Sequence, residues 1–168
     1  MISVAYIQMM AAYNRWQNVS VYAAADGLTE AARQLDRGAF FGSIHGTLNH
    51  LIWGDTIWLS RFAKTPPPRS PGIPGSVNER ADWAEMLAER PQLDQRIIDW
   101  AAAIDPAELN GDLTWFSGAA NRKITKPLWT LISHFHNHQT HHRGQVHALL
   151  TASGAKPGDT DLMLLPDE

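Results

Sequence analysis

Residues 127–153 read Pro127-Leu-Trp-Thr-Leu-Ile-Ser-His134-Phe-His136-Asn-His138-Gln-Thr-His141-His142-Arg-Gly-Gln-Val-His147-Ala-Leu-Leu-Thr-Ala-Ser153, and they carry six of the eight histidines of the chain. Within this stretch His134, His138 and His142 recur every four residues, which places them on one side of an α-helix. Two neutral imidazoles one helical turn apart can bind one divalent cation when a third ligand comes from another element. The stretch therefore predicts both a long helix and a candidate metal site.

The apolar residues of the same stretch indicate which side of this helix is buried. They form a stripe that includes His142 and has His138 at its edge: Leu128, Leu131, Ile132, Phe135, Val146 and Leu149. A histidine in such a stripe loses its water and needs either a hydrogen bond or a metal ion. We expect His136 and His141 to be solvated, and the pattern leaves the roles of His134 and His147 open.

Three further helical segments precede this one. The first is expected over residues 3–25, and the second, which is apolar nearly all round, over 40–63. Five prolines between residues 66 and 74 then predict a stiff, extended crossover to the third helix. The fold class is therefore predicted to be all-α, a single domain over residues 1–168 that forms a four-helix bundle with a long Pro-rich crossover between its second and third helices.

Local signals surround the third helix. Ser76 and Glu79 match a capping box, which predicts that the helix begins there. Pro91 lies inside the helical pattern and is expected to kink the helix or split it in two. Residues 113–116 and 122–125 are predicted to pair as a small hairpin before the fourth helix.

The composition limits the classes of function. A hydrophobic content of 44% with 18% charged residues is typical of a folded globule. The net charge of -3 offers no basic footprint for nucleic acid, and the absence of cysteine excludes disulfides, thiolate zinc sites and cysteine nucleophiles. No positive charge precedes Arg15 and no stretch of 18 apolar residues exists, so neither a secretory signal nor a membrane span is expected. We expect a soluble, cytoplasmic protein.

Glycines with an unusual spacing mark the second helix. Gly42, Gly46, His50 and Gly54 are separated by four residues each, so His50 lies on a ridge that is otherwise without side chains. A glycine inside a helix costs about 0.5–1 kcal/mol relative to alanine. Close approach of another helix would compensate for this cost, and so would a ligand cleft around His50.

Three motifs resemble those of the DinB/YfiT-like proteins. Thr47-Leu-Asn-His50-Leu-Ile-Trp-Gly-Asp55-Thr-Ile-Trp58 is similar to their second-helix motif, His134-Phe-His-Asn-His138-Gln-Thr-His-His142-Arg143-Gly-Gln145 to their fourth-helix motif, and Tyr13-Asn14-Arg-Trp16 to their first-helix pattern. The resemblance covers almost the whole chain. It implies a four-helix bundle, commonly a homodimer, that binds a divalent metal ion through three histidines, here His50, His138 and His142.

Three neutral imidazoles would leave a divalent ion with its full charge and with open positions, as in catalytic zinc sites. Zinc and nickel both suit imidazole ligands. Arg143 is expected either to form a structural ion pair, for which Asp55 is a partner, or to contact an anionic substrate. The candidate substrate contacts are Gly46, Gly54 and Arg143, and the sequence identifies no catalytic acid or base.

The resemblance also divides the functional hypotheses. Some relatives of this kind are thiol-dependent transferases or isomerases in which the metal activates mycothiol, bacillithiol or glutathione. The leading hypothesis is therefore a metal-dependent enzyme that transfers a low-molecular-weight thiol, as cosubstrate, to a small electrophilic substrate. The alternatives are a metal-dependent hydrolase that activates water and a non-catalytic metal-binding stress-response protein.

Overall fold

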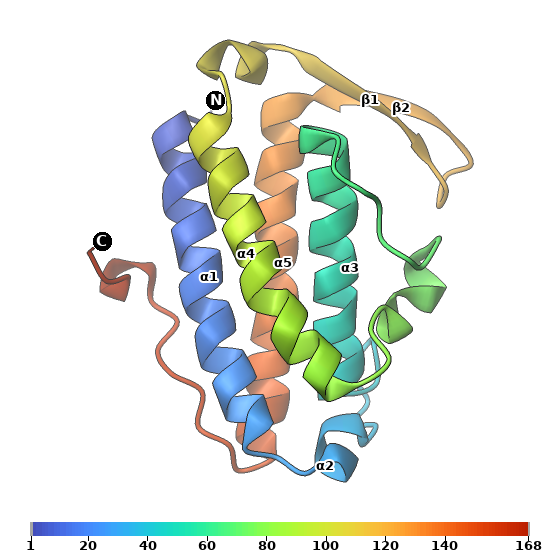
Figure 1. Ribbon diagram of the computed structural model, residues 1–168, viewed down its shortest axis with the longest axis vertical. Helices are drawn as coiled ribbons and strands as arrows, with labels where there is room; N and C mark the ends of the chain where they lie inside the picture. Colours follow the sequence, from blue (N-terminus) through green and yellow to red (C-terminus); the bar gives the residue numbers. More distant parts are fainter. Residues whose placement is uncertain (1, 168) are drawn as a thin grey trace.

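The computed structural model describes residues 2–167, and it is mostly helical with one small sheet (Figure 1). Four long helices run side by side, and the remaining elements are short. The helices are α1 Val4–Asp26, α2 Glu30–Gln34, α3 Ile44–Ala63, α4 Trp83–Ala103 and α5 Leu128–Ala152, the 3-10 turns are η1 Ile73–Asn78, η2 Pro106–Asn110 and η3 Leu162–Leu164, and the strands are β1 Asp112–Ser117 and β2 Arg122–Pro127. The prediction of a mainly helical chain is confirmed.

Each long helix packs against two others. Helix α1 contacts α4 and α5, and α3 contacts the same two helices from the other side. The four helices bury one continuous apolar core, to which Ile7 of α1, Ile52 of α3, Leu93 of α4 and Phe135 of α5 each contribute a side chain that is at most 1% exposed. Because both α3 and α5 face this core, side chains on their contacting surfaces can meet.

Helix α3 begins four residues later than predicted. Ser43 is its N-cap, and the Ser43 hydroxyl accepts a hydrogen bond from the backbone N–H of Gly46. Gly42, just before the cap, has a φ of +73°, a conformation that favours glycine and ends the preceding turn. The glycine ridge predicted inside this helix therefore contains only Gly46 and Gly54.

Helix α4 also begins later, so the prediction that Ser76 and Glu79 open it is wrong. Asp82 is the N-cap and accepts from the backbone N–H of Glu85. Ser76 instead lies in η1, and Glu79 is buried. Its carboxylate accepts hydrogen bonds of 2.8 Å from the backbone N–H groups of Arg69 and Ser70. Side chains that resemble a capping box thus stabilise the connection between α3 and α4.

Pro91 does not split α4, which continues unbroken through it. Proline removes one backbone N–H from the helix. Pro91 is exposed, so its ring projects away from the core. Apolar residues of α4 before and after Pro91 pack into the core and keep the helix continuous. Leu93 and Ile97 supply that packing after the proline.

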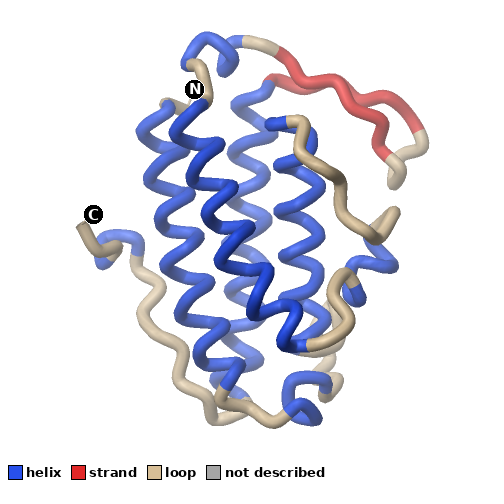
Figure 2. The backbone as a smooth tube through the Cα atoms, viewed as in Figure 1, coloured by secondary structure: helices blue, strands red, loops and turns tan. Residues whose placement is uncertain are grey.

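The predicted hairpin is confirmed as a two-stranded antiparallel sheet at one end of the long helices (Figure 2). Trp115 of β1 is paired with Ile124 of β2. The Trp115 ring packs edge-on against Trp58 of α3 at 5.7 Å, and the guanidinium of Arg61 lies over both rings. These contacts fix the sheet to α3.

Within the described residues, no helix is both long and apolar enough to cross a membrane.

Candidate metal centre

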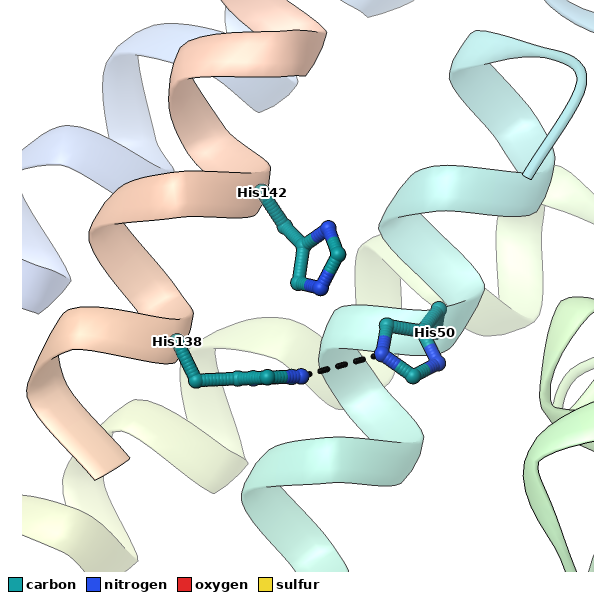
Figure 3. Close-up of side chains that lie close together, drawn as sticks. All are labelled: His50, His138 and His142. Atoms are coloured by element: carbon teal, nitrogen blue, oxygen red, sulfur yellow. Dashed lines mark hydrogen bonds between the residues drawn. The ribbon is translucent and has the colours of Figure 1, made fainter. Parts of the chain in front are cut away.

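Three histidines of α3 and α5 converge in the space between these helices (Figure 3). One ring nitrogen of each of His50, His138 and His142 lies within 4.8 Å of the other two. His138 and His142 are one turn apart on α5, and their ring centroids are separated by 4.5 Å. His50 reaches them from α3, with its Nε2 atom 3.0 Å from Nε2 of His138. The three residues that the motifs bring together are thus neighbours in space.

Burial keeps these imidazoles neutral. The pKa of His50 is lowered to about 3 by burial and by the nearby His142 ring. The pKa of His138 is likewise lowered to about 3 by burial and then by the neighbouring imidazoles, and burial lowers the pKa of His142 as well. Neutral imidazole is the form that binds a metal ion. The electrostatics of the site therefore fit a cation held by nitrogen ligands.

Hydrogen bonds to the second ring nitrogens orient two of the three rings. The Nδ1 atom of His142 lies 2.7 Å from Oε1 of Gln145, one turn further along α5. The Nδ1 atom of His50 lies 2.8 Å from the hydroxyl oxygen of Ser76 in the connection between α3 and α4. Nδ1 of His138 is buried and has no hydrogen-bond partner among the described residues. Hydrogen bonds of this kind fix the orientation of metal-binding histidines in proteins.

Gly54 makes room for one of the imidazoles. A Cβ atom on Gly54 would lie 2.7 Å from Cε1 of His138, closer than such contacts allow. A Cβ atom on Gly46 would lie 2.5 Å from the backbone oxygen of Phe41. The absence of a side chain at Gly54 therefore leaves room for the imidazole of His138, a candidate ligand. The absence of a side chain at Gly46 leaves room for the backbone of Phe41, which precedes α3. That either glycine contacts a substrate stays a prediction.

Two aromatic rings stack on His50. The Phe41 ring stacks on His50 with centroids 3.8 Å apart, and Trp53 stacks on it at 5.7 Å. Phe41 also lies 5.3 Å from the ring of His142, and its neighbour Phe40 is 80% exposed. No sequence pattern indicated a role for Phe41, because Phe41 belongs to none of the three motifs. Apolar rings beside the nitrogen cluster exclude water from one side of it.

The predicted pair between Asp55 and Arg143 is wrong. Both oxygens of Asp55 have other partners, namely the Arg90 guanidinium at 2.8 Å and the Gln139 amide at 3.0 Å. Arg143 turns toward α1, where it donates to Asn14. The sequence did not indicate Arg90 as the partner of Asp55. Arg90 belongs to α4, and no local sequence pattern determines how α4 packs against α3. Arg143 is buried and also lines a cavity of about 300 Å³ between α1 and α5.

The other histidines lie outside the cluster. His136 is 1% exposed, so the prediction that it is solvated is wrong. Its face of α5 turns toward α1, where Tyr6 packs edge-on against it, and its Nδ1 contacts Gln139 at 3.2 Å. His141 is exposed, as predicted. His134 is exposed with its ring against Trp58, and His147 is half-buried at the α1–α5 cavity.

Comparison with known proteins places the chain in a family. No protein with a curated function matches this sequence. A family model, that of the DinB family, matches residues 1–168. The match covers the two helices that carry the histidine cluster as well as the hairpin and the connection between α3 and α4. The chain therefore belongs to the DinB family.

Proposed function

We propose that His50, His138 and His142 bind one divalent metal ion, zinc or nickel, and that the protein uses it to activate a low-molecular-weight thiol. The observation that supports this most is the convergence of three neutral imidazoles, those of His50 and His142 buried and that of His138 half-buried, with no carboxylate in the group. A divalent ion bound there would keep its full charge and would lower the pKa of a thiol that it binds.

The reaction that we propose is S-transfer to a small electrophile. With an epoxide, a carbon–sulfur bond forms, the strained carbon–oxygen bond breaks, and the proton of the thiol ends on the epoxide oxygen. Phe41, together with the exposed Phe40 at 4.9 Å from it, offers an apolar surface beside the imidazoles for the electrophile. Gly46, Gly54 and Arg143 remain the candidate substrate contacts.

The alternative hydrolase function has less support. Metal-dependent hydrolases commonly use a nearby carboxylate as general base. The nearest candidate in the sequence motifs, Asp55, has both oxygens engaged by Arg90 and Gln139. A thiol whose pKa is lowered by a metal ion needs no such base. The third candidate is a non-catalytic metal-binding protein, which would bind the ion without turnover.

The test begins with protein purified without added metal and without a histidine tag. Elemental analysis should give about one zinc or nickel ion per chain. The cobalt-substituted protein should then gain sulfur-to-metal charge-transfer absorption with glutathione, bacillithiol or mycothiol, and should accelerate consumption of an epoxide by that thiol. Cleavage of esters or amides without any response to thiols would support the hydrolase, and bound metal without turnover would support the non-catalytic protein.

We also propose that the four long helices form a four-helix bundle of the DinB/YfiT type in one domain, with residues 64–82 as its crossover, and that two copies form a homodimer. The mutual packing of α1, α3, α4 and α5 supports the bundle. The resemblance of the sequence motifs supports the dimer. Sedimentation equilibrium measures the mass in solution, and a monomeric mass at micromolar concentration would contradict the dimer.

A further inference from the structure

The hydroxyl of Ser76 lies between two partners. It is fully buried in η1, with its oxygen 2.8 Å from Nδ1 of His50 and 2.6 Å from the backbone oxygen of Ile73. A serine hydroxyl has one hydrogen to donate, and a carbonyl oxygen can only accept. The Ser76 hydrogen therefore goes to Ile73, and the Ser76 oxygen accepts the Nδ1–H of His50. This leaves Nε2 of His50 unprotonated and directed at the other two histidines.

The connection that carries Ser76 is fixed to α3 on both sides of His50. Asn49 forms two hydrogen bonds with the backbone of Arg80, at 2.8 and 3.2 Å. Trp53, one turn later, donates its indole N–H to the backbone oxygen of Ser70 at 2.8 Å. The Glu79 carboxylate accepts the backbone N–H groups of Arg69 and Ser70 and so closes this loop on itself. Ser76 is thus held in one place relative to the His50 ring.

His50 is the only member of the described cluster whose ring is oriented from outside α3 and α5. His142 uses Gln145, a residue of its own helix, for the same purpose. His138 has no such partner in residues 2–167. If nothing held the proton of His50 on Nδ1, it could equally reside on Nε2, and the ring would then present a hydrogen instead of a lone pair to a cation.

We propose that Ser76, together with the backbone oxygen of Ile73, is a positioning residue of the metal centre that keeps His50 in the metal-binding tautomer. The proposal rests on the proposed function in so far as the site binds a metal, but the tautomer itself is a property of the metal-free protein. It assigns a role in the site to the Pro-rich connection between α3 and α4. Partners of this kind contribute about 10–100-fold to metal affinity.

The first test reads the tautomer directly. Long-range proton–nitrogen correlation spectra of the metal-free protein, labelled with nitrogen-15 at histidine, distinguish Nδ1–H from Nε2–H rings. We expect His50 to be Nδ1–H in the wild-type protein and to shift toward Nε2–H in Ser76→Ala. The matched control is Ser70→Ala, because the Ser70 hydroxyl lies in the same connection and also donates to a backbone oxygen, that of Gly75, but forms no hydrogen bond with a histidine within residues 2–167. It should leave His50 unchanged.

The second test measures cobalt(II) and zinc(II) affinity by competition with a chelator. Ser76→Ala should bind each ion about 10–100-fold more weakly than the wild type, and Ser70→Ala should bind as the wild type does. A His50 ring that is Nε2–H in the wild type overturns the proposal, even if Ser76→Ala does not fold. A folded Ser76→Ala that binds cobalt(II) and zinc(II) as tightly as the wild type also overturns it. A wild type that binds no metal but has Nδ1–H at His50 contradicts the proposed function alone.

Discussion

The Nε2 atoms of His50 and His138 lie 3.0 Å apart, so one ring must donate its hydrogen to the other. Because the proton of His50 is on Nδ1, where Ser76 accepts it, the donor is His138. His138 therefore carries its hydrogen on Nε2 in the metal-free protein and leaves its buried Nδ1 bare, which agrees with the absence of a partner for Nδ1 among the described residues.

This relationship predicts that His138 changes tautomer when zinc(II) binds. In the metal-free protein the spectra described above should assign His138 as Nε2–H. In the zinc-loaded protein its Nε2 must be free to bind the ion, so the hydrogen should move to Nδ1. His50 should stay Nδ1–H in both states and is the internal control. A His138 ring that is already Nδ1–H without metal would contradict the prediction.

Removal of any one of the three imidazoles should remove most of the metal. His50→Ala, His138→Ala and His142→Ala each leave two nitrogen ligands, which form a weak site for zinc or nickel. Elemental analysis after dialysis against a mild chelator measures the loss. His141→Ala and His134→Ala are the matched controls because both side chains lie on α5 and are exposed. Full retention of metal by one of the three cluster variants would exclude that residue as a ligand.

The position of Gly54 against His138 makes a separate prediction. The Cβ atom of Gly54→Ala would meet Cε1 of the His138 imidazole at 2.7 Å and force that ring out of its present position. We expect the affinity for zinc(II) to fall by at least about 10-fold, a loss of the size that misoriented ligands produce. Gly144→Ala on α5 is the control, since its Cβ atom would meet nothing within 4 Å. Removal of a helix glycine should instead stabilise that variant by up to about 1 kcal/mol. Equal zinc affinity in the two variants would contradict the prediction.

Sequence patterns predicted the parts of the fold that depend on residues close together in the chain. The apolar stripe within residues 127–153 predicted the long helix α5 nearly to its ends, and residues 113–116 and 122–125 were predicted to pair as a hairpin, as the structure has them. The cap of α4 was misread, because Ser76 and Glu79 have the spacing of a capping box but bind elsewhere. Residue type alone does not distinguish a cap from a loop that forms the same hydrogen bonds with another element.

The candidate site was predictable only in part for the same reason. The four-residue spacing brought His138 and His142 together, and the family motif added His50. No local pattern indicated that Ser76 would contact His50, or that Arg90 rather than Arg143 would pair with Asp55. Those contacts depend on how α3, α4 and their connection pack, which is set by the whole core.

Burial of imidazoles makes the stability of the metal-free protein depend on pH. The pKa of His50 is lowered to about 3 and that of His136 to about 4, chiefly by burial, and burial also lowers the pKa of His45. In the unfolded chain each of these imidazoles takes up a proton as the pH falls through about 6.5, whereas in the folded protein the imidazoles of His50 and His136 remain neutral until about pH 3–4. The stability that neutral imidazoles contribute is therefore complete above pH 6.5, and it is lost progressively as the pH falls from 6.5 toward 3–4.

We expect the free energy of unfolding to fall by about 1–2 kcal/mol for each fully buried imidazole between pH 7 and pH 5. Urea unfolding in the presence of a chelator, at several pH values, measures this. His45→Leu removes one buried imidazole away from the cluster, and its dependence on pH should be shallower than that of the wild type. A free energy that is constant from pH 7 to pH 5 would be inconsistent with imidazoles that stay neutral in the fold.

The buried ion pairs of Arg90 make the largest predicted effect on stability. Its guanidinium contacts Asp55 at 2.8 Å and Asp94 at 2.9 Å, and all three residues are at most 2% exposed. Arg90→Ala would leave two buried carboxylates without the guanidinium that contacts them, since Asn14, Asn18 and Gln139, which also contact them, supply hydrogen bonds but no charge. Loss of one partner from such a pair costs about 3–5 kcal/mol.

The control is another arginine of the same helix. Arg96 contacts Glu89 at 2.5 Å, but its side chain is 43% exposed, so Arg96→Ala should cost at most about 1 kcal/mol. Urea unfolding of both variants at pH 7 compares the two costs under one condition. If Arg90→Ala is no less stable than Arg96→Ala, the guanidinium of Arg90 is not what compensates for the burial of Asp55 and Asp94.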